Sequence, residues 1–277
     1  MKRVFCFFVL AVLVAACSFE KKAPENTSLE PKAIRKFVNY EISSFTEMMG
    51  PCKSDSAQRQ CLIFQVEFPV ITGLVPQSVA EKLNYHIEKD ILSSSFISNK
   101  PGSFKELKEE LNADYTSMIS DFPDYNNAWV FEVNSDILYQ DSLFISVATT
   151  VYSYTGGAHP NSGQVYRSYD LRTGDPITLD QLLVENYEAK LYPAAEIEFR
   201  MTREIPPEMS LQEGGFWFDE GQFSLNENFA IINKSLVFYF NPYEIAPYSV
   251  GPTELELKLT DFVDLIADGS VIDGYKN

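Results

Sequence analysis

Residues 152–161, Tyr-Ser-Tyr-Thr-Gly-Gly-Ala-His-Pro-Asn, hold the side chains of this chain that are best suited to chemistry. Gly156 and Gly157 allow positive φ angles and a close approach of another backbone. His159 changes its charge near neutral pH, and the Asn161 amide can hydrogen-bond a sugar or a peptide. Together with Tyr154, these are the first candidate binding residues. The alternative is that the segment only builds a tight connection between two strands.

A second segment, residues 238–252, alternates aromatic residues with prolines: Phe-Tyr-Phe-Asn-Pro-Tyr-Glu-Ile-Ala-Pro-Tyr-Ser-Val-Gly-Pro. Tyrosine combines a broad apolar ring with a polar hydroxyl, which suits a surface that stacks on glycans or contacts a protein. Tyr243 and Tyr248 are therefore candidate binding residues. Aromatic residues also fill cores and corners, so a structural role stays open for this segment.

Patterns typical of catalytic or metal centres are not found in the sequence. The chain has two histidines, His86 and His159, and lacks the paired His or Cys spacing of a zinc site. It has no glycine-rich phosphate loop and no Gly-x-Ser-x-Gly elbow. We therefore expect no catalytic residue, no metal and no cofactor, and a protein that is not an enzyme. The alternative is an enzyme that acts on peptidoglycan through the Gly-Gly-Ala-His-Pro loop.

The first 17 residues predict export and lipidation. Lys2 and Arg3 precede an apolar run that ends in Leu-Val-Ala-Ala-Cys, with Cys17 last. This run is too short for a permanent membrane helix, which needs about 20 residues, and small residues after a short apolar run mark a cleavage site. Residues 1–16 are thus predicted to be a lipoprotein signal peptide and Cys17 to be the lipidated first residue of the mature chain. The polar residues 17–36 are predicted to be a flexible tether.

A lipid anchor places the folded part in the cell envelope, attached to a membrane. Ser18 does not match the acidic inner-membrane retention signal, which favours the outer membrane. Cys52 and Cys61 are the cysteines that remain beyond Cys17. In an oxidising envelope they favour a disulfide that closes a polar loop, and two free thiols are the alternative.

The composition describes an acidic, globular protein. Hydrophobic residues make up 45% of the chain and aromatic residues 14%, enough to fill a sizeable core. Removal of the two charges Lys2 and Arg3 with the signal peptide changes the formal net charge from −17 to −19. This excess of carboxylates argues against binding to nucleic acid, which needs clustered Lys and Arg. It favours general solubility or attraction to a cationic protein.

The hydrophobic pattern predicts an α+β fold of antiparallel sheets with helices packed on one face. Helical spacing is found at about 78–92, 104–119 and 178–199, and Pro193 is expected to kink or divide the last helix. Alternation and flanking turn residues predict strands at 37–42, 61–71, 129–133, 143–154, 164–170, 229–232, 236–240 and 255–259.

Three motifs occur in a fixed order: Tyr-Thr-Gly-Gly-Ala-His-Pro at 154–160, Tyr-Asp-Leu-Arg-Thr-Gly-Asp-Pro-Ile-Thr-Leu-Asp-Gln-Leu-Leu at 169–183, and Phe-Asn-Pro-Tyr-Glu-Ile-Ala-Pro-Tyr-Ser-Val-Gly at 240–251. Over most of residues 37–266 the chain resembles the extracytoplasmic module shared by the RsiV anti-sigma factor and the PdaC peptidoglycan deacetylase. The resemblance implies two consecutive α+β subdomains. Residues 37–160 resemble the N-terminal region of PdaC, and residues 161–277 resemble the C-terminal region of RsiV.

In relatives of the RsiV type this module binds lysozyme, and in the deacetylase it precedes a separate catalytic domain. Here a lipobox stands in place of the cytoplasmic segment and membrane helix of an anti-sigma factor, and no such catalytic domain is recognised. The resemblance therefore implies a non-enzymatic envelope lipoprotein that binds a protein ligand such as lysozyme, or cell-wall material such as peptidoglycan. A scaffold role in the envelope is a further alternative. The acidic charge suits a cationic lysozyme, because opposite charges attract at long range.

Overall fold

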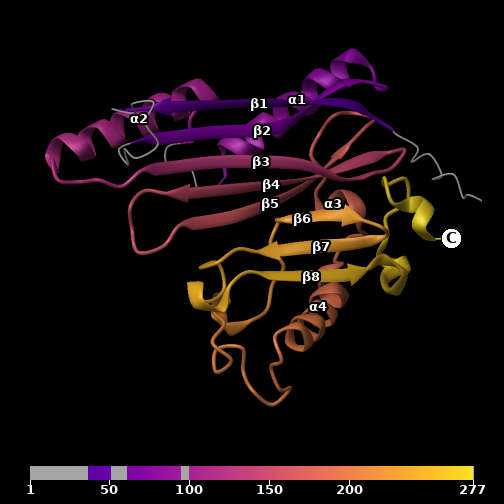
Figure 1. Ribbon diagram of the computed structural model, residues 1–277. Helices are drawn as coiled ribbons and strands as arrows, with labels where there is room; N and C mark the ends of the chain where they lie inside the picture. Colours follow the sequence, from indigo (N-terminus) through magenta and orange to yellow (C-terminus); the bar gives the residue numbers. More distant parts are fainter. Residues whose placement is uncertain (1–36, 51–60, 95–99, 277) are drawn as a thin grey trace, which may run out of the picture. The chain divides into compact units, whose positions relative to one another are not determined.

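A computed structural model describes residues 37–50, 61–94 and 100–276 of the chain (Figure 1). They belong to one compact unit that spans Lys36–Asn277. The predicted signal peptide, the tether, Cys17 and Cys52 lie outside the described residues. Within the described part, no helix is both long and apolar enough to span a bilayer.

The first sheet has five strands in the order β1-β2-β3-β4-β5. The α+β class is confirmed with one correction, because β2 and β3 run parallel and the sheet is therefore mixed. Helices α1 and α2 lie between β2 and β3 in the chain. This helical crossover allows β3 to run in the same direction as β2. The bounds are β1 Asn39–Met49, β2 Leu62–Gly73, α1 Gln77–Leu92, α2 Phe104–Asp121, β3 Trp129–Gln140, β4 Phe144–Tyr154 and β5 Asn161–Asp170.

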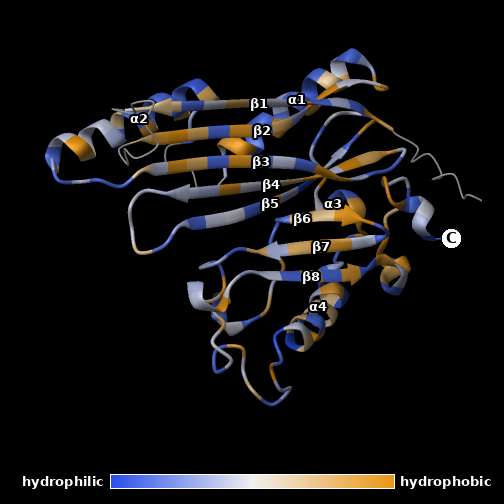
Figure 2. Cartoon of the chain, viewed as in Figure 1, coloured by the Kyte–Doolittle hydropathy of each residue, from blue (hydrophilic) through white to orange (hydrophobic). Residues whose placement is uncertain are grey.

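Helices α1 and α2 pack on one face of this sheet. Leu83, Ile87 and Ile91 of α1 are buried in the same hydrophobic cluster as inward-facing residues of β2 and β3. Their spacing of three to four residues places them on one side of the helix. Along β3, hydrophobic and hydrophilic residues alternate, as expected for a strand that is covered on one side (Figure 2). The predicted helical face of α1 is thus confirmed.

A second, antiparallel sheet contains β6 (Phe229–Ile232), β7 (Ser235–Phe240) and β8 (Thr253–Lys258). Helix α4 (Glu188–Thr202) contacts β8, and Phe199 of α4 lies at the centre of a group of aromatic rings in this core. The predicted helix is interrupted between α3 (Leu179–Leu182) and α4, before Pro193. Helix α4 then continues through that proline. The expected division of the helix at Pro193 is therefore wrong. Short 3-10 helices lie at Asp219–Gly221, Tyr248–Val250, Leu259–Leu265 and Asp273–Lys276.

Asparagine side chains from the second sheet region cover the outer edge of β5. The Asn241 amide accepts a hydrogen bond from the Gln164 N–H at 2.7 Å and donates to the Gln164 carbonyl at 3.0 Å. Asn228 accepts from the Tyr166 N–H at 2.6 Å. These amides satisfy backbone groups that an edge strand otherwise leaves unpaired. The predicted boundary after residue 160 falls in the turn between β4 and β5, so the first sheet extends across it.

Candidate functional site

Three rings from the two candidate segments form a row at the surface, which we call the aromatic row. His159 stacks on Tyr248 with ring centroids 4.2 Å apart and 15° between the ring planes. The ring of Tyr243 lies next to that of Tyr248, with centroids 5.4 Å apart. His159 comes from the turn between β4 and β5, whereas both tyrosines follow β7. The structure thus brings together candidates that are far apart in the sequence.

The Pro160 carbonyl holds the rings in place. It accepts a hydrogen bond from the Tyr248 hydroxyl at 3.3 Å, and it lies 2.9 Å from Nδ1 of His159. Because a carbonyl oxygen can only accept, this contact requires the proton of a neutral imidazole to be on Nδ1. His159 and Tyr243 are exposed, and Tyr248 is half-buried. The aromatic row is therefore ordered by internal contacts and still open to a ligand.

The backbone of Tyr243 supports a role at the surface. Its φ angle is +68°, in the left-handed region that non-glycine residues seldom adopt, and its side chain is 56% exposed. Such a conformation costs about 1–2 kcal/mol in an L-residue. Strained residues of this kind gather at binding and catalytic sites. The exposed ring gains little from burial that would offset this cost.

Gly156 is required for packing inside the turn. Its φ is +85°, and a Cβ atom on it would lie 1.9 Å from the Tyr125 hydroxyl oxygen. That hydroxyl donates to the Thr155 carbonyl at 3.1 Å and accepts from Nε1 of Trp129 at 2.8 Å. Gly157, in contrast, has open space around it, with the nearest atom 3.9 Å from its hypothetical Cβ. The two glycines therefore differ in role.

The other two candidates lie at the strand ends that frame the turn. Tyr154 is the last residue of β4 and pairs with Val130 of β3. Asn161 is the first residue of β5 and pairs with Ser153 of β4. These positions belong to the base of the turn, and no contact of the described residues links them to the aromatic row.

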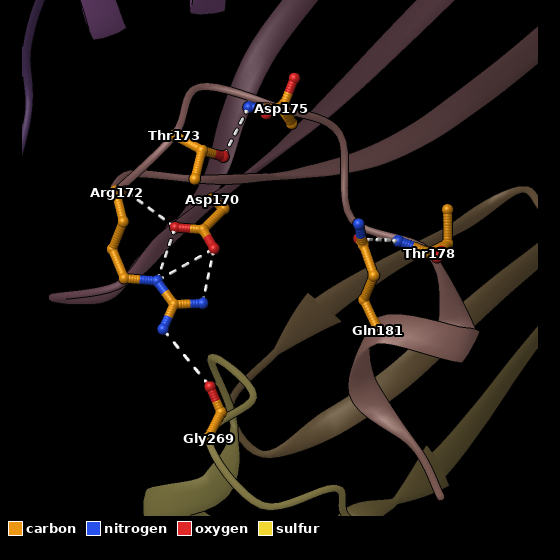
Figure 3. A network of polar contacts seen from close by, with 7 residues as sticks. All are labelled: Asp170, Arg172, Thr173, Asp175, Thr178, Gln181 and Gly269. Atoms are coloured by element: carbon orange, nitrogen blue, oxygen red, sulfur yellow. Dashed lines mark hydrogen bonds and ion pairs between the residues drawn. The ribbon is translucent and has the colours of Figure 1, made fainter. Parts of the chain in front are cut away.

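The middle motif, residues 169–183, forms a polar network (Figure 3). Arg172 donates from Nε to both carboxylate oxygens of Asp170 at 3.0 Å, and from a terminal nitrogen to the Gly269 carbonyl at 3.4 Å. The hydrogen bonds with Asp170 raise the pKa of Arg172. Lys82 of α1 pairs with Asp175 at 2.6 Å, and this contact lowers the pKa of the Asp175 carboxyl. The motif thus ties β5 to α1 and to the C-terminal loop.

The described part of the chain holds no assembled metal centre. No group of three or more His, Cys, Asp or Glu residues there is arranged to hold a metal ion. The nearest carboxylate partner of His86 is Asp175, 3.7 Å from its Nε2 atom, and the pair has no serine or cysteine nucleophile in hydrogen-bond contact among the described residues. The Cys61 carbonyl accepts from the Trp129 N–H at 2.8 Å, whereas Cys52 is not described, so their pairing stays a prediction.

Family models match two parts of the chain. Residues 56–162 match the model described as Deacetylase PdaC, and residues 180–260 match Protein of unknown function (DUF3298). The chain contains both regions of the extracytoplasmic module that its motifs resemble. The predicted resemblance is thereby confirmed.

Solved structures share the fold of this chain. A DUF3298 family member from Bacteroides fragilis has a TM-score of 0.68 at 18% identity and covers 86% of this chain and 98% of its own. A DUF3298 family protein from Pseudomonas aeruginosa has a TM-score of 0.60 at 16% identity, over 83% of this chain and 95% of its own. Both likenesses establish the architecture alone.

Curated relatives match a shorter part of the chain. Esterase Rv3036c of Mycobacterium tuberculosis is 31% identical over 118 residues, which are 40% of this chain and 48% of that protein. Immunogenic protein MPT64 of the same organism is 26% identical over 111 residues, which are 40% of this chain and 46% of that protein. The chain spans about half the length of the curated relatives it matches.

Proposed function

We propose that this chain is a lipid-anchored, non-enzymatic protein of the cell envelope that binds a cationic protein such as lysozyme. The aromatic row is the observation that carries this proposal. Tyrosine is enriched in the residues that contribute most to protein–protein binding, because its ring buries a large area with few rotatable bonds. The row offers two tyrosines and a histidine that are already held in place.

The charge of the chain supports a cationic partner. The formal net charge is −17, and Glu132 and Asp136 of β3 are exposed on the sheet face opposite the helices. An acidic surface speeds encounter with a basic protein, but this attraction is screened by salt and gives little specificity. Specific recognition is therefore assigned to the aromatic row, and the surrounding carboxylates are assigned to long-range attraction.

Titration calorimetry with egg-white lysozyme tests this proposal. Residues 18–277, which include the whole compact unit, are titrated at two salt concentrations. We expect saturable binding that persists at the higher salt concentration and becomes at least tenfold weaker in the variant His159→Ala/Tyr248→Ala. Phe122→Ala, which removes a ring that is also exposed but lies at the end of α2, is the matched control. Binding that disappears with salt, or that the double variant leaves unchanged, overturns the proposal.

Hydrolysis is a second candidate function, favoured by the 31% identity to a mycobacterial esterase. His159 is the exposed titratable group in the loop, and it would have to act as the base. Turnover of a short-chain nitrophenyl ester or of peptidoglycan by the wild-type chain, lost in His159→Ala, would support this function. No turnover by the wild-type chain removes it.

A further inference from the structure

A cavity with several polar lining residues adjoins the aromatic row. Its volume is about 540 Å³, and its described walls come from the C-terminal end of α1, from β5, and from the loops at 226–228 and 241–244. Tyr243 lines this cavity and also belongs to the aromatic row. Cavities of this size are typical of small-molecule sites when a few polar groups converge in them.

A charged pair forms part of the cavity wall. Nε of Arg167 lies 3.6 Å from a carboxylate oxygen of Asp90, and a terminal nitrogen of Arg167 donates to the Glu227 carbonyl at 3.0 Å. The Tyr169 hydroxyl donates to the same Asp90 oxygen at 2.7 Å. Burial and the nearby Asp90 carboxylate raise the pKa of Tyr169, so this donor keeps its proton. The guanidinium and the carboxylate are therefore held in fixed positions.

Two polar atoms of residues in this wall lack a hydrogen-bond partner, although both atoms are shielded from solvent behind the cavity surface. Nε of Arg167 and Oγ of Ser94 are buried, and neither has a hydrogen-bond partner among the described residues. Buried polar groups are almost always paired, and an exception calls for an explanation. The amides of Asn228 and Asn241, in contrast, are already engaged with the edge of β5. The two unpartnered atoms thus lie at the charged pair and at the end of α1.

The cavity wall carries one positive and one negative side chain, and this combination favours one class of ligand. Asp90 beside Arg167 disfavours both a simple anion and a simple cation, because each would face one like charge. A hydroxyl group can donate to the carboxylate and accept from the guanidinium, and hydrogen bonds to charged groups are the stronger kind. The exposed ring of Tyr243 at the cavity supplies an apolar face. A neutral polyhydroxyl ring satisfies all three requirements.

We propose that this cavity binds one unit of a neutral saccharide, with the sugar stacked on Tyr243 and its hydroxyls bound by Arg167 and Asp90. The left-handed backbone at Tyr243 agrees with this role, since glycine would be easier to accommodate there but would supply no ring. The inference goes beyond the proposed protein ligand and does not depend on it.

Ligand-observed saturation-transfer NMR with residues 18–277 tests this site. The probes are the tetramer of N-acetylglucosamine, maltotetraose and, as an anion, succinate. We expect saturation transfer to at least one tetrasaccharide and none to succinate. Tyr243→Gly removes the ring and fits the positive φ, so it should fold well and weaken binding about tenfold. Arg167→Gln should have a similar effect, whereas Phe122→Ala, which removes an exposed ring at the end of α2, should not.

The outcomes separate the two proposals. No transfer to either tetrasaccharide at millimolar concentration, transfer to succinate alone, or full binding by a folded Tyr243→Gly variant overturns the saccharide site. Circular dichroism of each variant establishes its folding. Lysozyme titration of the same samples is a separate measurement. Failure to bind lysozyme therefore leaves the saccharide result valid, and failure to bind a saccharide leaves the lysozyme result valid.

Discussion

The aromatic row and the Asp170–Arg172 network both come from recognisable sequence motifs. Their side chains differ in whether they bond to other groups of the protein or face solvent. Arg172 donates hydrogen bonds to the Asp170 carboxylate and to the Gly269 carbonyl. In the row, His159 and Tyr243 present their rings to solvent. A group that is fully engaged inside the protein has little left for a ligand. The difference separates a motif that holds the fold together from one that is available for binding.

Close packing at a positive φ separates Gly174, and Gly156 in the turn, from Gly157. A Cβ on Gly174 would lie 3.0 Å from both the Lys82 Cβ and the Val79 carbonyl oxygen, at a φ of +80°. Gly157 in the exposed turn is outside the left-handed region and has open space around it. The middle motif therefore needs its glycine for a close approach to α1, whereas the turn does not need Gly157 for packing.

The largest expected effect is that of Gly174→Ala. Its left-handed backbone costs about 1–2 kcal/mol, and the contact with α1 adds a similar amount, so we expect a loss of about 2–4 kcal/mol in the free energy of unfolding. Gly157→Ala is the matched control and should change that free energy by less than about 0.5 kcal/mol. Denaturant unfolding followed by circular dichroism measures both. Equal losses in the two variants would remove the proposed distinction between the two glycines.

Asn241→Ala is expected to lower the free energy of unfolding by an intermediate amount. It tests whether the aromatic segment also stabilises the fold, in addition to its proposed role in binding. The substitution leaves the Gln164 N–H without its side-chain partner, at a cost of about 1–3 kcal/mol, whereas the Gln164 carbonyl keeps its hydrogen bond from the Asn228 amide. Tyr248→Ala removes a half-buried surface ring and should cost less than Asn241→Ala in the same unfolding measurement. A reversed order would mean that the ring, and not the amide, stabilises this segment.

Much of the fold could be predicted from local patterns. The spacing of Leu83 and Ile87 identified the buried face of α1, and alternation identified the strands of both sheets. The parallel pairing of β2 and β3 was missed, because strand direction depends on how α1 and α2 cross the sheet. Pro193 was expected to interrupt a helix that in fact begins only at Glu188 and tolerates the proline.

The candidate site was predictable only in part. Residue types singled out His159, Tyr243 and Tyr248, but their stacking depends on contacts between distant segments that no local pattern encodes. The amide of Asn241 lay within a recognised motif, and its role at the edge of β5 appears only in the folded chain. Arg167 and Asp90 carried no local signal, because each is an ordinary charged residue in its own element.

The smallest expected effect is a pH dependence within the middle motif. Hydrogen bonding from Lys82 lowers the pKa of Asp175, with further contributions from Thr173 and His86. Above its ordinary pKa of about 4, the carboxyl is charged in both the folded and the unfolded chain, and the contact contributes in full. As the pH falls, the unfolded chain takes up the proton first, so the contribution is lost on the way down to the folded pKa. The pair is largely exposed, so Asp175→Asn should cost less than about 1 kcal/mol at pH 6. The gap in melting temperature between the wild-type chain and the variant should therefore be small at pH 6 and should shrink as the pH falls below about 4. A gap of constant size would show that Asp175 acts through its shape and hydrogen bonding, and that its charge has no part in joining α1 to the motif.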